Sequence, residues 1–387
     1  MNKLVICFST ASLNAEIWTN KQHLMTRLSK IDGYEVIYID QGMSKAEIAR
    51  EFKRINLGYF LNPVRKISKN LTSISPYFLP LLRGGKLKEI SWNLLWDLFL
   101  KKYINDNFDE IIIWTYQPQS WYLIKKLRNF AIPFKFIYDC VDDFKSQPAY
   151  KNNKARKDEL IKIEGELVKQ VNLVVTTSEK LYEDKIKLNK NTHYVHNVGD
   201  FDHFNSPENL DSESAHFLNQ IDKEKIVYAG VIDDYKIDLE LIVKTAVYFA
   251  DKVFILIGPV RVPENHEHLV KLRSLKNVYF LGLVKYQILP TVLHKCDTIW
   301  LPYNNNEHTR YVFPLKLFEA FATGKKIIAK SLQSYKAYHH LMITFDSFED
   351  LKIKFENKNY LSQERIEVAA KNSWESRLSK IIKLLEN

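Results

Sequence analysis

The chain has 387 residues, of which 46% are hydrophobic and 13% aromatic. This content can fill the cores of two domains of about 150–200 residues each, and it excludes extensive disorder. The net charge of +10 is uneven: residues 1–200 hold 31 Lys and Arg against 22 Asp and Glu, whereas residues 201–387 hold 25 against 24. Residues 51–104 alone hold 10 against 3, so the basic character is concentrated there.

Neither a membrane span nor a secretion signal is visible. No run approaches the roughly 20 apolar residues that cross a bilayer, and the apolar run at residues 4–8 is too short for a signal peptide. We therefore expect a cytoplasmic protein, either soluble or peripheral at the inner face of the membrane. Cys7, Cys140 and Cys296 each lie within an apolar run, which indicates buried thiols in a reducing compartment.

Short apolar runs alternate with polar or amphipathic segments along the chain. In the first half we expect strands at residues 3–8, 34–39, 110–115, 134–138 and 173–176, and helices at 18–30, 120–129 and 155–171. In the second half we expect strands at residues 225–230, 253–257, 278–281, 298–301 and 326–329. This alternation predicts parallel sheets covered by helices on both faces, an α/β fold of two doubly wound, Rossmann-like domains.

The domain boundary is predicted in the polar, strandless stretch at residues 206–224, where charged residues, Asn and Ser are frequent. The first domain then covers residues 1–205 and the second residues 225–365. Residues 366–387 have the pattern of one closing amphipathic helix.

The stretch from Pro314 to Gly324 is the most informative. A proline in the first turn of an amphipathic helix places Lys316 and Glu319 near the start of that helix. Unpaired N–H groups there favour a diphosphate, and a carboxylate one turn further in can accept hydrogen bonds from a ribose. A surface ion pair of a few tenths of a kcal/mol is the alternative. The flanking Leu315, Leu317, Phe318 and Phe321 instead indicate burial, where charges need partners.

Two further segments belong to this predicted site. Ligands bind beyond the carboxyl ends of parallel strands, so the loop at residues 304–313 should line it. Thr309, Arg310 and the backbone N–H of Tyr311 are candidate diphosphate contacts, with Arg310 neutralising the leaving group. Gly230 ends a strand and either lets the backbone approach a ligand or forms an ordinary turn. With no complete dinucleotide fingerprint, no cofactor is expected.

Asp139, Asp142 and Asp143 follow an apolar run that ends near Tyr138. A carboxylate crowded by like charges at a strand end could act as general base for an acceptor hydroxyl. Asp142 or Asp143 could equally cap a helix, so both readings stay open. The spacing of the histidines fits no zinc site, and no metal is expected.

Residues 51–104 combine basic with aromatic side chains. The basic residues include Arg65, Lys66, Lys69, Arg83, Lys86 and Lys88, and the aromatic residues include Tyr59, Phe60, Tyr77, Phe78, Trp92, Trp96 and Phe99. Such a mixture suits an anionic membrane surface, at about 1 kcal/mol per well-placed cation, with solvated helix faces as the alternative. No nucleic-acid module accompanies the charge, so nucleic acid is not expected as a partner.

The string Pro314-x-Lys316-x-x-Glu319-x-x-x-x-Gly324 and the segment Tyr138 to Asp143 resemble GT-B glycosyltransferases, particularly bacterial enzymes that build surface polysaccharides. The resemblance implies two domains facing a cleft and a C-terminal helix that crosses back to the first. It also implies transfer from a nucleotide-diphosphate sugar, with UDP-sugar foremost, to a saccharide acceptor that is lipid-linked. Trp18 and His23 resemble the acceptor-side entry of these transferases, although a lone histidine is often structural.

One position departs from the pattern. Many retaining members carry a glutamate eight residues before the one at Glu319, and this chain has Tyr311 there. The stereochemistry and the donor sugar therefore stay open, with the overall resemblance favouring retention. A nucleotide-sugar epimerase of the same architecture, or a catalytically inert scaffold of a polysaccharide synthesis complex, are the alternatives.

Overall fold

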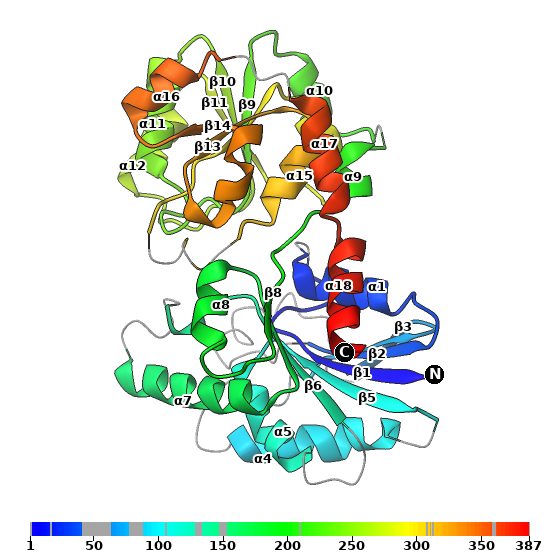
Figure 1. Ribbon diagram of the computed structural model, residues 1–387. Helices are drawn as coiled ribbons and strands as arrows, with labels where there is room; N and C mark the ends of the chain where they lie inside the picture. Colours follow the sequence, from blue (N-terminus) through cyan, green and yellow to red (C-terminus); the bar gives the residue numbers. More distant parts are fainter. Residues whose placement is uncertain are drawn as a thin grey trace. The chain divides into compact units, whose positions relative to one another are not determined.

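A computed structural model describes residues 2–15, 18–40, 63–76, 88–104, 107–127, 134–146, 153–208, 210–306, 309, 311, 313–357 and 361–386. The chain divides into two compact units. Unit 1 consists of residues 1–196 together with 378–387, and unit 2 consists of residues 197–377. Both units combine strands and helices as expected of an α/β protein (Figure 1).

The described strands of unit 1 form one sheet in the order β3-β4-β2-β1-β5-β6-β7-β8. They are β1 (Lys3–Phe8), β2 (Tyr34–Ile39), β3 (Val64–Ser68), β4 (Leu71–Ile74), β5 (Glu110–Thr115), β6 (Phe134–Cys140), β7 (Leu173–Thr176) and β8 (Thr192–Tyr194). Neighbouring strands are parallel except β3, which is antiparallel to β4. All six residues of β1 are buried, because a central parallel strand is covered on both faces.

Helices cover both faces of this sheet. They are α1 (Asn20–Leu28), α4 (Lys88–Leu95), η2 (Trp96–Leu100), η3 (Lys101–Tyr103), η4 (Pro118–Ser120), α5 (Trp121–Leu127), η5 (Phe144–Ser146), α7 (Lys154–Gln170) and α8 (Glu179–Lys185). Figure 1 shows α4, α5 and α7 on one face, where α5 contacts both α4 and α7, and α1 on the other.

The β3–β4 hairpin was not predicted from the sequence. We expected no strand between residues 39 and 110, but residues 64–68 and 71–74 form two strands at the edge of the sheet. Thr72 and Ser73 of β4 are buried polar residues, so they interrupt the apolar run that marks a buried strand.

Two tryptophans of the basic segment also differ from expectation. Trp92 and Trp96 are buried rather than interfacial. Trp92 packs edge-to-face on Phe8, with ring centroids 5.1 Å apart, and Trp96 packs on Phe134 at 6.4 Å. Their spacing of four residues turns both toward the sheet. Tyr59, Phe60, Tyr77, Phe78, Arg83, Lys86 and the side chain of Lys88 lie outside the described residues.

Unit 2 has a parallel sheet in the order β11-β10-β9-β12-β13-β14. Its described strands are β9 (Lys225–Ala229), β10 (Val253–Ile257), β11 (Val278–Gly282), β12 (Thr298–Leu301), β13 (Lys326–Lys330) and β14 (Ile343–Phe345). Its helices are α9 (Phe201–Asn205), α10 (Glu213–Asn219), α11 (Leu239–Tyr248), α12 (Glu267–Ser274), α13 (Leu289–His294), α15 (Lys316–Ala322), η6 (Gln333–Leu341), α16 (Phe348–Lys354) and α17 (Ser362–Lys371).

The end of the chain forms two helices instead of the one expected from residue 366. α17 ends at Lys371, and α18 (Trp374–Glu386) follows. The break is stabilised because Asn372 O accepts the N–H of Gly199, and Ser373 Oγ accepts the N–H of Ser376 in the first turn of α18. α18 begins in unit 2 and ends in unit 1, as the crossover predicted.

Residue contacts tie both ends of the chain together within unit 1. Lys3 Nζ lies 3.1 Å from Glu386 Oε1, and Lys135 Nζ donates to Leu385 O. The units divide between His196 and Asn197, and the polar stretch at residues 206–224 lies in unit 2.

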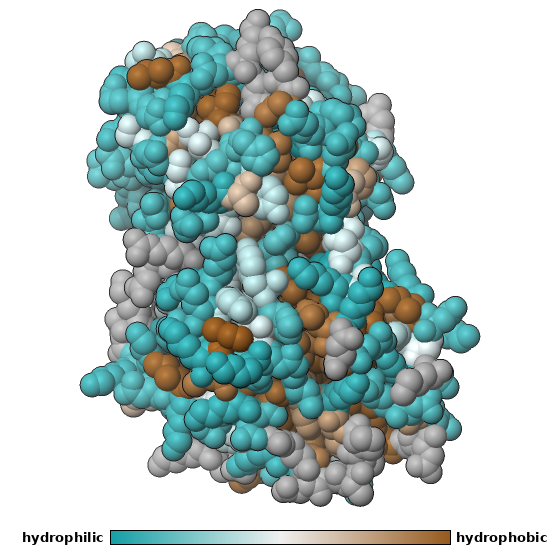
Figure 2. All heavy atoms as spheres, in the orientation of Figure 1, coloured by the Kyte–Doolittle hydropathy of each residue, from teal (hydrophilic) through white to brown (hydrophobic). Residues whose placement is uncertain are grey.

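The three cysteines are free and buried, as the sequence predicted. Burial raises the pKa of Cys7 and Cys140, and that of Cys296 to about 12. On the face drawn in Figure 2, hydrophilic residues predominate and hydrophobic ones are scattered in small groups.

Gly258 is required where the ends of β9 and β10 meet. Its φ is +131°, and a Cβ there would overlap the carbonyl oxygen of Gly230. Gly258→Ala should therefore lower the free energy of unfolding by about 2–4 kcal/mol. Gly165 lies within α7 and has open space around its Cα, so Gly165→Ala should stabilise by about 0.5–1 kcal/mol. Urea unfolding measures the free energy of unfolding of both variants. Equal changes in the two variants would contradict the close packing of Gly258 against Gly230.

Candidate functional site

The first turn of α15 carries the two charged residues that the sequence singled out. α15 begins at Lys316 with Leu315 as its N-cap, and Glu319 lies in the first turn. The sequence predicted Pro314 in the first turn of the helix, but Pro314 lies before the N-cap residue Leu315. The carbonyl of Pro314 accepts the N–H of Leu317, so the chain tightens as it enters the helix.

Two glycines allow the backbone to pack closely on this turn. A Cβ at Gly230, just beyond β9, would lie 2.9 Å from Lys316 Cε. A Cβ at Gly199 would lie 2.8 Å from the backbone nitrogen of Glu319. A larger residue at Gly199 would meet the backbone of α15 and displace it, whereas one at Gly230 would meet the side chains of Tyr228 and Lys316. Gly230 thus makes room for the stem of Lys316, a contact within the protein that the sequence did not reveal.

Lys316 and Glu319 are half-buried, and burial shifts the pKa of each in the direction that favours the neutral side chain. Desolvation raises the pKa of Glu319 to about 7, opposed by Lys316 and assisted by Asp200. Desolvation also lowers the pKa of Lys316, with Glu319 opposing and Lys236 assisting. Neither side chain forms an ion pair or hydrogen bond with a described residue, so the surface ion pair is not what the structure contains. Desolvated charges without described partners favour the binding of a ligand that supplies the missing partners.

Lys236 is a second cation near Lys316 that the sequence reading missed. It lies in the loop after β9, where its backbone N–H donates to Asp233 Oδ1 at 2.7 Å and its carbonyl accepts from Asn304 N at 2.8 Å. The repulsion between the two lysines is relieved when an anion binds between or beside them. The signal was available, because Lys236 lies in the loop that follows the carboxyl end of a parallel strand.

The loop after β12 is held to the loop after β9 by asparagine side chains. Asn304 Nδ2 donates to Asp234 O and Ile237 O, and Asn306 Nδ2 donates to Tyr235 O. These contacts fix the backbone beside α15 without using Lys236 or Lys316.

Three predicted diphosphate contacts lie further along this loop. Thr309 is buried, and its hydroxyl donates to Asn306 O and accepts from Asn306 N, so it stabilises the turn. Tyr311 is buried. Arg310 lies outside the described residues.

In unit 1, three aspartates lie at the carboxyl end of β6. Asp139 is inside the strand and fully buried, not beyond the strand end as predicted, because β6 extends to Cys140. Asp142 is partly exposed, with Oδ2 4.0 Å from Lys21 Nζ. Asp143 is buried, and its Oδ2 accepts no hydrogen bond from a described residue. Neither Asp142 nor Asp143 accepts a described backbone N–H, so the capping alternative finds no support.

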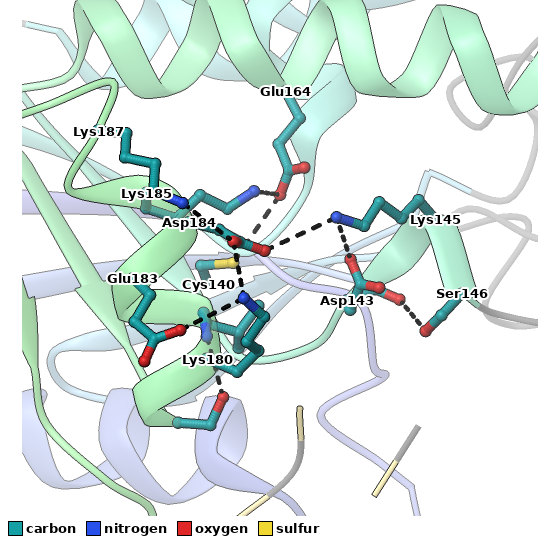
Figure 3. Close-up of polar contacts among 12 residues, drawn as sticks. Cys140, Asp143, Lys145, Ser146, Glu164, Lys180, Glu183, Asp184, Lys185 and Lys187 are labelled. Atoms are coloured by element: carbon teal, nitrogen blue, oxygen red, sulfur yellow. Dashed lines mark hydrogen bonds and ion pairs between the residues drawn. The ribbon is translucent and has the colours of Figure 1, made fainter. Parts of the chain in front are cut away.

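Asp143 belongs to the charged network in Figure 3. Lys145 Nζ lies 3.7 Å from Asp143 Oδ1 and 3.8 Å from Asp184 of α8. Burial raises the pKa of Asp143, and Lys145 lowers it.

A buried ion pair supports this end of β6. Glu164 of α7 lies 2.7 Å from Lys185 Nζ of α8 and accepts the hydroxyl of Tyr138, also at 2.7 Å. Cys140 contacts the same carboxylate, with Sγ 3.8 Å from Oε1 (Figure 3). The strand that carries the aspartates is therefore fixed to two helices.

Lys21 of α1 is another residue missed from the sequence. It is buried, and burial lowers its pKa, opposed by Asp142 and Asp139. Its Nζ also lies 5.5 Å from the ring centre of Tyr116. Like Lys236, it follows the carboxyl end of a parallel strand, here β1, which was the available signal.

Trp18 and His23 contact each other edge-to-face, with ring centroids 5.3 Å apart. His23 is buried, and its Nδ1 lies 3.2 Å from Arg27 Nη1. Trp18 is half-buried. Of the two predicted acceptor contacts, Trp18 is the more accessible.

No described helix is long and apolar enough to cross a bilayer. Within the described ranges, no group of three His, Cys, Asp or Glu side chains is arranged to hold a metal ion.

No family model matches the chain. The putative teichuronic acid biosynthesis glycosyltransferase TuaH of Bacillus subtilis (strain 168) is 24% identical over 205 residues, which cover 51% of each chain. The match thus spans about half the length of this curated relative. A sucrose-phosphate synthase of Thermosynechococcus elongatus superposes with a TM-score of 0.70 at 16% identity, covering 100% of this chain and 98% of that one. Anabaena HepE in complex with UDP gives a TM-score of 0.65 at 12% identity, covering 100% of both chains.

The chain has the GT-B fold. The superpositions cover all of this chain and at least 98% of each other chain, which confirms the two Rossmann-like domains that the sequence predicted. In this fold, α15 belongs to the second domain and β6 to the first.

Glu319 should make the ligand-free protein less stable as pH rises. An unfolded glutamate titrates near 4.5 and the folded one near 7, so between these values only the folded state keeps the proton. The free energy of unfolding therefore falls across this window, by at most about 3 kcal/mol. Urea unfolding at several pH values should show that Glu319→Gln flattens the fall. Glu267→Gln, at an exposed first-turn glutamate of α12, should leave it unchanged, and the same slope in both variants would refute the burial of Glu319.

Proposed function

We propose that this protein is a glycosyltransferase that moves a sugar from a nucleotide-diphosphate sugar to a saccharide acceptor during synthesis of a surface polysaccharide. The first turn of α15 carries the proposal, because Lys316 and Glu319 are desolvated there without described partners and Lys236 is close by. The likeness to TuaH supports the polysaccharide role. The complex of HepE with UDP supports a uridine diphosphate donor.

The chemistry of the donor suits these residues. A diphosphate would offset the charges of Lys316 and Lys236, and both lysines would stabilise the charge that develops on the departing diphosphate. Ionised Glu319 would accept hydrogen bonds from ribose hydroxyls. Arg310 and the backbone N–H of Tyr311 stay proposed diphosphate contacts, while the hydroxyl of Thr309 is engaged in its own turn.

UDP should stabilise the protein against heat through this site. At 100 times its dissociation constant, a ligand adds about 2.7 kcal/mol to the free energy of unfolding. Lys316→Ala and Lys236→Ala should each weaken UDP binding by roughly 10- to 100-fold, the range for a lost charge-assisted hydrogen bond. The exposed Lys276→Ala in the same unit is the matched control. Isothermal titration measures the affinities.

The outcome is decisive in either direction. GDP and TDP are tested in parallel, and a shift with one of them in place of UDP would change the nucleotide but keep the site. Failure of all three diphosphates to bind would remove the proposal. Binding without sugar transfer to any acceptor, and unaffected by Glu319→Ala, would favour an inert scaffold.

We propose Asp143 as the base for the acceptor hydroxyl if the reaction inverts the anomeric centre. Of the three candidates, Asp143 combines a raised pKa with a carboxylate oxygen that no described donor occupies. Asp139 is enclosed within β6, and Asp142 is the more exposed partner of Lys21. We place Trp18 beside the acceptor, since it remains half-exposed near the end of β1.

A base must be deprotonated, so transfer should slow as pH falls through the pKa of Asp143. Lys145 lowers that pKa, and Lys145→Met should therefore move the acid limb of the pH–rate profile to higher pH. Lys180→Met is the control, because Lys180 pairs with Glu183 and Asp184 but not with Asp143. Asp143→Asn should reduce kcat by about 10²–10⁴-fold. Full activity in Asp143→Asn would mean that no base acts there, as in a retaining reaction.

We further propose a lipid-linked acceptor and a peripheral position at an anionic membrane, consistent with the positive charge of residues 51–104.

A further inference from the structure

The outer face of α4 and η2 carries an aliphatic stripe. Ile90, Leu94 and Leu98 are 53%, 41% and 56% exposed, and they follow one another at intervals of four residues. This spacing places them along one side of the helix, over about 12 Å. The opposite side holds Trp92, Leu95, Trp96 and Leu100, which are buried against the sheet. The helix is thus apolar on both sides, and only the inner side is covered.

Basic residues continue the stripe at its C-terminal end. Lys101 and Lys102 of η3 are exposed and stand three and four residues after Leu98. Lys102 lies over the ring of Tyr103, with Nζ 5.2 Å from the ring centre. Lysines paired with half-buried tyrosines beside aliphatic side chains are typical of a surface that meets lipid headgroups.

The neighbouring helix adds to this charge. α5 packs against α4 (Figure 1), and its Lys125 is exposed with Nζ 5.5 Å from the ring centre of Tyr122. Asp97 lies among the stripe residues, but its carboxylate is 3.9 Å from Lys126 of α5. The described charges here are therefore four lysines against Asp97 and Glu35, the carboxylate that acts on Tyr103 and lies 3.5 Å from Lys66 Nζ. This excess of positive charge is complementary to anionic lipid rather than to a second copy of the same surface.

We propose that Ile90, Leu94 and Leu98, with Lys101, Lys102 and Lys125, form the face by which the protein lies on an anionic lipid surface. The three aliphatic side chains enter the headgroup boundary, and the lysines contact the lipid phosphates. The proposal deepens the proposed function, since a lipid-linked acceptor is presented at such a surface. It differs from the sequence reading, because the inward tryptophans take no part.

Sedimentation of the full chain with vesicles tests this face. The chain should bind vesicles of phosphatidylcholine with 30% phosphatidylglycerol, and bind much less to phosphatidylcholine alone. Leu94→Glu, which places a charge in the middle of the stripe, should reduce the bound fraction at least tenfold. Lys101→Glu combined with Lys102→Glu should abolish the preference for the anionic vesicles, and added salt should act in the same direction.

Ile161→Glu is the matched control. Ile161 is 44% exposed on α7 of the same unit, but it belongs to no stripe. This variant should bind vesicles as the unaltered chain does. Leu94 lies in unit 1 and the proposed donor site in unit 2, so each variant is tested twice. Urea unfolding shows that Leu94→Glu still folds, and unchanged UDP affinity shows that the donor site is independent of vesicle binding.

Several results would overturn the proposal. These are equal vesicle binding by the unaltered chain and Leu94→Glu, no binding to anionic vesicles, or equal binding to both vesicle types. A concentration-dependent dimer that Leu94→Glu dissociates would assign the stripe to a second copy of the chain instead. If the unaltered chain does not bind UDP, the result counts against the proposed function but not against the lipid-binding role of this face.

Discussion

The burial of the parallel strands limits the positions at which charged side chains can lie, and both candidate sites depend on this limit. Most residues of β1, β6, β9 and β12 are covered on both faces, and apart from Asp139 inside β6 the charged groups of both candidate sites stand at or beyond the end of such a strand. Lys21, Asp143 and Glu319 are found at or beyond such ends, and each loses water there. The loss of water lowers the pKa of Lys21 and raises the pKa of Asp143 and Glu319, so the neutral form of each is favoured. Both candidate sites in this protein are consequences of that single constraint.

Each site is held in place by contacts that do not use its reactive groups. In unit 2, Asn304 and Asn306 bind the backbone of the loop after β9, which leaves Lys236 and Lys316 available. In unit 1, the ion pair of Glu164 with Lys185 joins α7 to α8, and the hydrogen bond from the Tyr138 hydroxyl to Glu164 joins them to β6. Positioning of this kind lowers the reorganisation that a transferase must accomplish when its substrates bind. The two rigid frameworks therefore suit a reaction in which catalysis is mostly placement and charge stabilisation.

The GT-B fold by itself accommodates many chemistries, so the proposed sugar transfer depends on the residues at α15. Tyr311 occupies the position where many retaining members carry a glutamate, and here the tyrosine is buried. Glu319 is the acidic residue in the first turn of α15. Asp200 raises the pKa of Glu319 and accepts the hydroxyl of Tyr286 at 3.3 Å, which connects the first turn of α15 to the loop after β11.

The sequence by itself determined the fold class and the long apolar strands. β1, β2, β5, β7, β10 and β12 have the residues that the apolar runs predicted, because burial on both faces leaves a continuous local pattern. Lys316 and Glu319 were also found from local spacing. β3 and β4, the short β8 and β14, and the break between α17 and α18 were not, since polar residues or only three residues mark them.

Tertiary structure alone decided which side chains meet. Three of these contacts join segments far apart in the chain. Gly230 makes room for Lys316, Lys236 lies near Lys316, and Lys21 approaches Asp142. The inward position of Trp92 and the outward position of Leu94 likewise follow from packing on the sheet. A local pattern shows that a helix has an apolar side, but desolvation and long-range contact depend on what the rest of the chain places against it.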